Sequence, residues 1–138
     1  MTNKLTEQNE VLYRHIHPDF LDGDEPSSDR FRPSKKDENK LSVDRSSIHD
    51  AETSHKIYTS TGRKSAAIFG VSVGEFGGKS IDCLEDPVVA RDATDTEPAV
   101  PENRAHALAN YSAHSEKDQK NVAKELKRLA MQRKKIFP

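Results

Sequence analysis

The chain has 138 residues, of which 33% are apolar and 33% are charged, and its formal net charge is −1 at pH 7. The length predicts one domain, and the balanced charge excludes a general affinity of the whole molecule for nucleic acid or for an anionic membrane. Cys83 is the one cysteine and no run of about 18 apolar residues occurs, so we expect a cytoplasmic protein without disulfides, a cysteine-based zinc site or a membrane-spanning helix.

The N-terminal part of the sequence predicts a disordered lead-in, one strand and a long irregular segment. Residues 1–10 are polar and show no apolar periodicity, whereas "VLYRHIH" at 11–17 alternates in a β-rich run that Pro18 ends. The segment 19–39 is rich in Asp, Ser, Pro and charge, and Phe20 and Phe31 are expected to anchor it to the core at two points. A loop of this length in a small domain is typical of a functional or a disordered segment.

The middle of the chain predicts two strands on either side of a helix. "KLSVDR" predicts a strand near 40–44, and Ser46 or Ser47 is suited to cap a helix over 48–60. The run at 66–73 is the most apolar of the chain, as expected for a central strand that is buried on both faces.

The sequence that follows predicts a hairpin and then a mobile loop. Residues 79–84 are expected to pair back onto the preceding strand across a turn at 77–78. Residues 86–104 hold three prolines and alternate acidic with small residues, which is typical of a mobile loop. "AHALANYS" at 105–112 is compatible with a strand or with a short helix.

An amphipathic helix is predicted at 115–135, where apolar residues recur at helical spacing and Ser115 with Asp118 resembles a capping box. Eight Lys or Arg against three acids make this end basic, so nucleic acid is excluded as a partner except through this helix. Together the elements predict an α+β fold in one domain at 11–138. Its small mixed or antiparallel sheet is covered by the central helix and the C-terminal helix.

The stretch "GVSVGEFGGKS" ends like a nucleotide-binding P-loop but lacks the spacing of one. A P-loop has a glycine five positions before the glycine of Gly-Lys-Ser, and Val73 occupies that position here. The residues after Ser80 favour a strand and not the helix whose N-terminus binds phosphate. We therefore expect a turn, and no nucleotide binding through Lys79.

The six histidines form no recognisable metal motif. His15 and His17 point to one face of the predicted strand and are the one candidate pair, with Asp19, His106 or His114 as a third ligand. In the other interpretation, one of these two histidines packs inside the domain and the other forms a hydrogen bond with a backbone carbonyl at the strand end. We favour the second interpretation, with no metal and no cofactor.

Four segments in order, "HPDF", "SSDRFRP", "KDENKLSV" and "AHA", resemble a family of small bacterial proteins. The resemblance covers residues 11–112 and implies no particular activity. It marks the positions of His17, Pro18, Phe31, Pro33, Lys36, Asp37, Leu41, Ser42, Val43 and His106.

A second resemblance is to ADP-ribosyltransferase-like toxins and RES-type NAD-degrading domains. Those families open on a strand that bears an Arg or His, which Arg14 or His17 matches, and end with a catalytic Glu, which Glu75 matches. The chain lacks their Ser-Thr-Ser and Glu-x-Glu or Gln-x-Glu motifs. The resemblance implies a compact enzyme that acts on NAD or another nucleotide, with Arg14, His17, Lys36 and His106 in one pocket.

The leading functional hypothesis is a small binding protein that acts as an accessory to a larger protein partner, in a toxin-like or defence-linked system. This hypothesis rests on the long polar loop at 19–39, which carries many charged side chains, and on the charged flanks of the chain. The surface expected to bind the partner comprises Arg32, Lys36, Asp37 and Ser42. The alternative is the NAD-dependent enzyme, with catalytic candidates Arg14, His17, His106 and Glu75.

Overall fold

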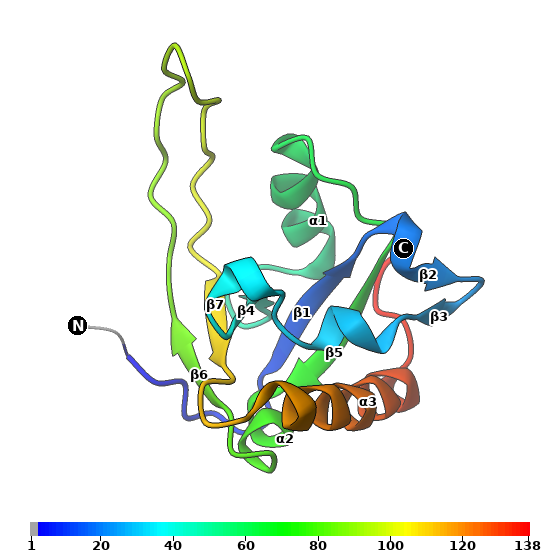
Figure 1. The fold of residues 1–138 in the computed structure, drawn as a ribbon. Coiled ribbons are helices and arrows are strands. Elements are labelled where there is room, and N and C mark those ends of the chain that lie inside the picture. The colour runs from blue at the N-terminus through cyan, green and yellow to red at the C-terminus, as the bar shows by residue number, and fades with distance from the viewer. Residues whose placement is uncertain (1–2) are drawn as a thin grey trace.

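The computed structural model describes residues 3–138, and its centre is a five-stranded antiparallel sheet (Figure 1). A separate two-stranded hairpin lies beside it. In their order across the sheet the five strands are β5 (Ala67–Ser72), β1 (Val11–Ile16), β4 (Lys40–Arg45), β7 (His106–Asn110) and β6 (Asp82–Glu85). The hairpin consists of β2 (Leu21–Asp22) and β3 (Glu25–Pro26).

Three helices and three one-turn 3₁₀ helices surround the sheet, which confirms the predicted α+β class. The helices are α1 (Ala51–Ser60), α2 (Val73–Gly77) and α3 (Glu116–Arg133), and the turns are η1 (Pro18–Phe20), η2 (Ser28–Phe31) and η3 (Lys35–Asp37). Helix α3 packs on β5 and η2 and buries one face, so the predicted C-terminal amphipathic helix is confirmed. Within the described residues, no helix combines the length and the apolar character that a membrane crossing requires.

The core lies between the sheet and α3. Leu12 and Ile16 of β1 pack there with Phe31, which is 1% exposed and confirms one of the two predicted anchors. The other predicted anchor is wrong, because Phe20 is 41% exposed and lies outside the core. The hydroxyl of buried Tyr111 donates a hydrogen bond to the Phe31 carbonyl (2.5 Å), which fixes the irregular segment to the strand side of the core.

Helix α1 begins three residues later than predicted, at residue 51. Asp50 caps it, because its carboxylate accepts a hydrogen bond from the Thr53 N–H (2.8 Å). Ser47 serves another purpose, since its hydroxyl donates to the buried carboxylate of Glu10 (2.5 Å).

The predicted hairpin across residues 77–78 is wrong. The Ser72 hydroxyl accepts a hydrogen bond from the Glu75 N–H (3.1 Å), and the Glu75 carboxylate accepts one from the Ser72 N–H (2.8 Å). This capping box starts α2 at residue 73. Strand β6 consequently pairs with β7, and not with β5.

Segments near both ends of the chain cover the two edges of the sheet. Beside β5, the Ile136 N–H donates to the Ile68 carbonyl (2.8 Å), so β5 is the last strand of the sheet and yet buried at every position. Beside β6, the Leu5 N–H donates to the Cys83 carbonyl (2.8 Å), and the Leu5 side chain is buried. Of the predicted lead-in at 1–10, residues 1 and 2 lie outside the described residues, and the rest contributes this edge contact. Covered edges offer no row of free backbone groups to another chain.

Candidate functional site

Residues 86–104 connect β6 to β7 and form an arm that extends well beyond the sheet (Figure 1). Its two sides are joined at Val88 with Asn103 and at Arg91 with Val100, each pair by two backbone hydrogen bonds of 2.8 or 2.9 Å. Between the pairs, the intervening N–H groups on the 88–93 side make no hydrogen bond within the described residues. The expected loop is thus an extended ribbon, and its mobility stays a prediction.

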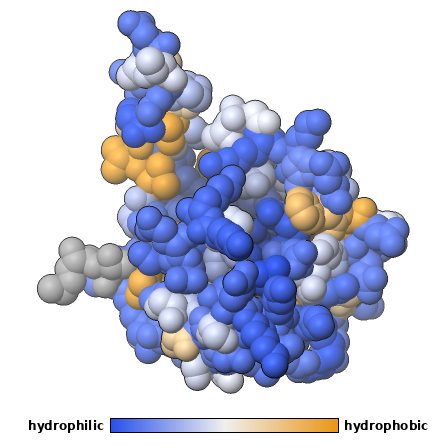
Figure 2. Space-filling view, viewed as in Figure 1, coloured by the Kyte–Doolittle hydropathy of each residue, from blue (hydrophilic) through white to orange (hydrophobic). Residues whose placement is uncertain are grey.

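The arm displays apolar and acidic side chains to solvent. Val89 is 81% exposed, whereas the next most exposed large apolar side chain of the described residues, Phe20, is 41% exposed. Figure 2 shows a hydrophobic patch on the lower part of the arm. Five acidic residues against two arginines give the whole segment a negative charge. Apolar and charged groups exposed together in this way are typical of a surface that contacts another molecule.

A cleft of about 490 Å³ lies between the arm and α1, with the sheet as its floor. The floor contains Arg14, His15, Ser42, Asp44 and His106, which come from β1, β4 and β7. Helix α1 and the residues just after it supply Ile57, Tyr58 and Arg63, and the arm supplies Val88, Val100 and the prolines beside it. Apolar walls over a polar floor are the common composition of a ligand site.

The floor is open because β1 and β4 pair only at their ends, Leu12 with Arg45 and Tyr13 with Asp44. Beyond this point the strands separate, and the guanidinium of Arg14 fills the gap. Its Nη1 donates to the Ser42 carbonyl (3.0 Å) and its Nε to the carbonyl of residue 30 (2.6 Å). The cleft therefore has a positive charge built into its floor.

Three guanidinium groups at or near the cleft have no carboxylate partner among residues 3–138: those of Arg14, Arg30 and Arg63. Burial, and then the charge of Arg30, lower the pKa of Arg14 to about 10, so it stays protonated at neutral pH. The Arg30 Nε is buried without a hydrogen-bond partner, and the guanidinium of Arg63 lies over the Tyr58 ring, 5.5 Å from its centroid. The cleft thus presents cationic groups without an ion-pair partner.

A buried hydrogen-bond network joins the floor to α1. His15 Nε2 contacts Ser54 Oγ (3.1 Å), whose hydroxyl donates to Asp44 Oδ2 (2.5 Å), and Asn103 Nδ2 donates to Asp44 Oδ1 (3.0 Å). His15 Nδ1 contacts Ser65 Oγ (3.0 Å). Because the Ser54 proton goes to Asp44, its oxygen accepts from His15, and these contacts assign the Nε2–H tautomer to His15.

Charge in this network resides on Asp44. Burial lowers the pKa of His15, which keeps the imidazole neutral. Burial alone raises the pKa of Asp44, but the contacts from His15, Ser54 and Asn103 outweigh it and hold the pKa of Asp44 below its ordinary value. With a neutral His15 and an ionised Asp44, each ring nitrogen and each carboxylate oxygen has a hydrogen-bond partner. The network therefore stiffens the floor of the cleft.

The Asp–His–Ser set of this network is not a nucleophilic triad. Ser54 is fully buried and gives its proton to Asp44 instead of to an imidazole nitrogen. The His15 ring is stacked on Tyr58, with centroids 4.0 Å apart and planes at 7°. Nucleophilic serine chemistry needs an accessible hydroxyl that donates to the base, and Ser54 meets neither condition.

Three of the residues predicted from the sequence line the cleft: Arg14, Ser42 and His106. His106 stands where the arm leaves the sheet, with Nδ1 3.0 Å from Asp86 Oδ2 and 2.9 Å from the Asp86 carbonyl. Ser42 contributes its backbone carbonyl as a partner of Arg14. Arg14 and His106 were expected in one pocket and Ser42 on a separate binding surface, and the separation of β1 from β4 brings the three together.

The other predicted residues lie elsewhere and have local structural contacts. His17 Nδ1 accepts from the Asp19 N–H (3.0 Å) and caps η1. Glu75 caps α2 and pairs with Arg133 (2.8 Å).

Of the predicted binding loop, only Ser42 reaches the cleft. Arg32 pairs with Asp29 (3.1 Å), and Asp37 caps η3 through Ser34. Lys36 is exposed. The loop is thus a folded surface turn. Of the four residues expected in one pocket, only Arg14 and His106 line the cleft.

The residues that organise the cleft were not predicted from the sequence: Asp44, Ser54, Tyr58, Arg63 and Asn103. They come from β4, α1, the turn after it and the arm, and no local spacing relates them. One available signal was the pair Ser54 and Tyr58, which lie four residues apart on one face of a helix that otherwise carries charge.

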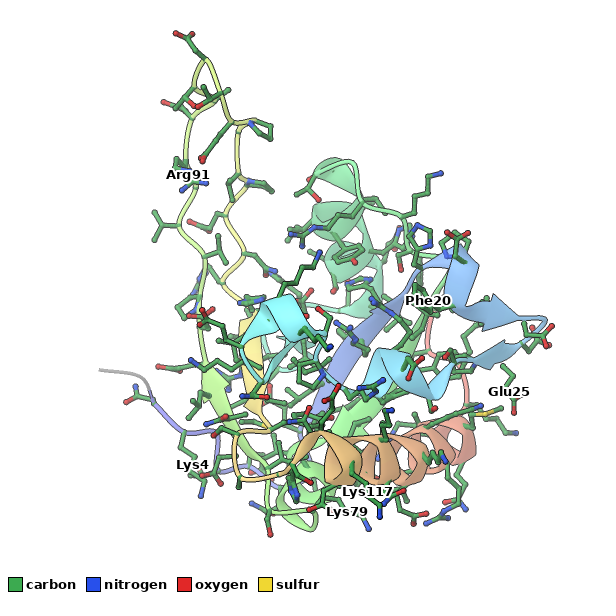
Figure 3. All side chains as sticks on the ribbon, in the orientation of Figure 1. Lys4, Phe20, Glu25, Lys79, Arg91 and Lys117 are labelled. Atoms are coloured by element: carbon green, nitrogen blue, oxygen red, sulfur yellow. The ribbon has the colours of Figure 1, made fainter. Side chains whose placement is uncertain are left out.

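The Gly-Lys-Ser stretch follows a helix instead of starting one. Gly78 is the C-cap of α2, and the Lys79 carbonyl accepts from His114 Nε2 (2.6 Å). The next element is β6, in agreement with the spacing argument against a P-loop. Figure 3 shows Lys79 at the end of the molecule opposite Arg91 of the arm.

Across residues 3–138 no group of three or more His, Cys, Asp or Glu side chains is arranged to hold a metal ion. Comparison with protein-family models, with curated proteins and with solved structures finds no match to this chain. The function is therefore inferred from the arm and the cleft.

Proposed function

We propose that this chain is a small cytoplasmic binding protein that acts with a larger protein partner, and that the arm at 86–104 is the element that docks the partner. One observation carries the proposal. The arm extends an 81% exposed Val89 into solvent, and between its two paired points the N–H groups of residues 89 and 90 make no hydrogen bond within the described residues. An extended segment with free N–H groups is suited to pair with an open strand edge of another protein.

The charge of the arm indicates the chemistry of the partner. The arm holds five acidic residues against two arginines, and this net negative charge repels nucleic acid and anionic lipid. It favours a basic protein surface with an apolar hollow for Val89. The predicted toxin-like or defence-linked setting fits such an accessory protein. A reduced Cys83, buried in the core without a disulfide, fits the cytoplasm.

The enzyme that acts on NAD or a nucleotide is the second candidate, and the presence of Arg14 and His106 in one cleft favours it. Its expected catalytic carboxylate, Glu75, is bound by Arg133 and by the start of α2. The cleft's own carboxylate, Asp44, has a lowered pKa and accepts from Ser54 and Asn103, so it is a poor general base. These contacts favour binding over catalysis.

The proposal is tested with a photo-crosslinking amino acid placed at Val89 in the cells from which the gene comes. The matched control carries it at Lys117, an exposed position of α3 that Figure 3 shows at the other end of the molecule from the arm. We expect a discrete cross-linked product from position 89 that is absent from position 117. The product should weaken when Asp92 and Asp95 are both changed to Lys, because the arm then loses its negative charge.

No product at position 89, or the same product at both positions, contradicts docking through the arm. Persistence of the product at full yield in the Asp92→Lys, Asp95→Lys variant contradicts the basic partner surface.

A further inference from the structure

The cleft contains cationic groups that form no ion pair within the described residues. Arg14 uses Nε and Nη1 on two backbone carbonyls, and its Nη2 makes no hydrogen bond within the described residues. Arg63 is exposed at the mouth of the cleft, over the Tyr58 ring. A guanidinium presents several N–H groups in a plane that matches the oxygens of a carboxylate or a phosphate.

The electrostatics of the floor make an added anion favourable. Arg14 is half-buried and stands near a second guanidinium, that of Arg30, and both burial and this repulsion disfavour its charge. Asp44 is the ionised carboxylate of the floor, but it makes no ion pair with Arg14, and Ser54 and Asn103 each donate a hydrogen bond to one of its oxygens. An oxyanion placed on the free side of Arg14 therefore gains a charge-assisted contact without displacing an existing pair.

The walls indicate the rest of the ligand. Ile57 of α1 faces Val100 and the flanking prolines of the arm across the cleft, so the body of the ligand is apolar. The Tyr58 ring is not free for stacking, because His15 lies flat against it and Arg63 lies over it. A volume of about 490 Å³ is within the range of about 300–1,000 Å³ for small-molecule sites.

We propose that this cleft binds a small molecule with an apolar body and one oxyanion group, a phosphate or a carboxylate, which Arg14 and Arg63 hold. The site uses other residues of the arm than the proposed docking does, because Val89 and the arm's acidic tip do not line it. His106 at the base of the arm is placed to contact the same ligand.

The test uses three probes with the same ring: phenyl phosphate, benzoate and the neutral benzyl alcohol. Binding to the intact chain is followed by amide chemical shifts in NMR titrations. We expect one of the two anions to bind with a Kd of about 1 mM, as suits a fragment of this size, and the alcohol at least about tenfold more weakly. The better anion identifies the oxyanion as phosphate or carboxylate.

Arg63→Ala should weaken binding of that anion about tenfold, because it removes one of the two guanidinium groups. Lys64→Ala is the matched control, since Lys64 is the adjacent exposed cation and does not line the cleft. Both changes lie in an exposed turn and should leave the fold intact. Arg14→Lys, which keeps the positive charge but loses the planar guanidinium with its several N–H donors, should weaken binding as well. If that variant does not fold, Arg63→Ala decides.

Three results overturn the site: neither anion binds, the alcohol binds as tightly as the anions, or Lys64→Ala weakens binding as much as Arg63→Ala. The last of these would show that the anions respond to general surface charge.

Discussion

Changing Ser54 to Ala tests the buried network beneath α1. The Ser54 hydroxyl donates to Asp44 at 2.5 Å and accepts from His15 at 3.1 Å, and the residue is fully buried. The change leaves an ionised carboxylate without one donor and an imidazole N–H without its acceptor. Each buried unsatisfied group costs about 1–3 kcal/mol, and partial relaxation reduces the sum, so we expect the free energy of unfolding to fall by about 2–4 kcal/mol at pH 7.5.

The cost of this change should depend on pH in a defined direction. The folded-state pKa of His15 lies below its ordinary value, so the stability that the neutral His15 contributes is present above about pH 6.5 and is lost as the pH falls. Without the hydroxyl, a protonated His15 can pair directly with Asp44, which stands 3.5 Å away, and this loss shrinks. The difference between the two proteins should therefore be smaller at pH 5 than at pH 7.5.

Urea unfolding followed by circular dichroism at the two pH values measures both effects, and the contributions of the other histidines cancel in the comparison. Ser60→Ala is the control, because Ser60 is an exposed position near the end of the same helix and should change stability by less than about 0.5 kcal/mol. A cost below about 1 kcal/mol for Ser54→Ala at pH 7.5, or a cost that is the same at pH 5, refutes the assigned network.

Three further predictions concern the rest of the fold. Gly70→Ala should destabilise the protein by about 1–3 kcal/mol, because the new methyl group would stand 2.5 Å from Val11 Cγ1, and thermal unfolding measures the loss. Lys79→Ala should leave ATP and GTP binding unchanged in equilibrium dialysis, because no helix N-terminus follows it; a loss confined to this variant would contradict the spacing argument. Changing Lys36 and Asp37 together to Ala should cost no more than about 1 kcal/mol in urea unfolding, because the pair caps and decorates one exposed turn, and a larger loss would show a structural role.

The elements that could be predicted from the sequence are those whose signal is local. The strand at 11–16 follows an alternating pattern, α3 follows a 3.6-residue pattern, and Phe31 is an isolated large apolar residue in a polar segment. Helix α2 was missed because the capping box of Ser72 and Glu75 lies in a glycine-rich stretch that favours a turn.

The cleft could be predicted only in part because it is assembled from distant segments. Arg14 and His106 were expected in one pocket together with His17 and Lys36, but the cleft that the first two share follows from the separation of β1 from β4 and from the position of the arm. The partners of Asp44 lie 10 residues away, at Ser54, and 59 residues away, at Asn103. Pairings at such separations leave no periodic pattern in the sequence.

Amide hydrogen exchange across residues 86–104 tests the central claim most directly. In the isolated chain, we expect the amides of Val89 and Ala90 to exchange about as fast as those of an unstructured peptide, while the hydrogen-bonded amides of β5 stay protected. In the complex captured through Val89, the same arm amides should slow by about 100-fold or more. Strong protection of the arm in the isolated chain, or arm amides that exchange equally fast in the complex, would contradict docking through this segment.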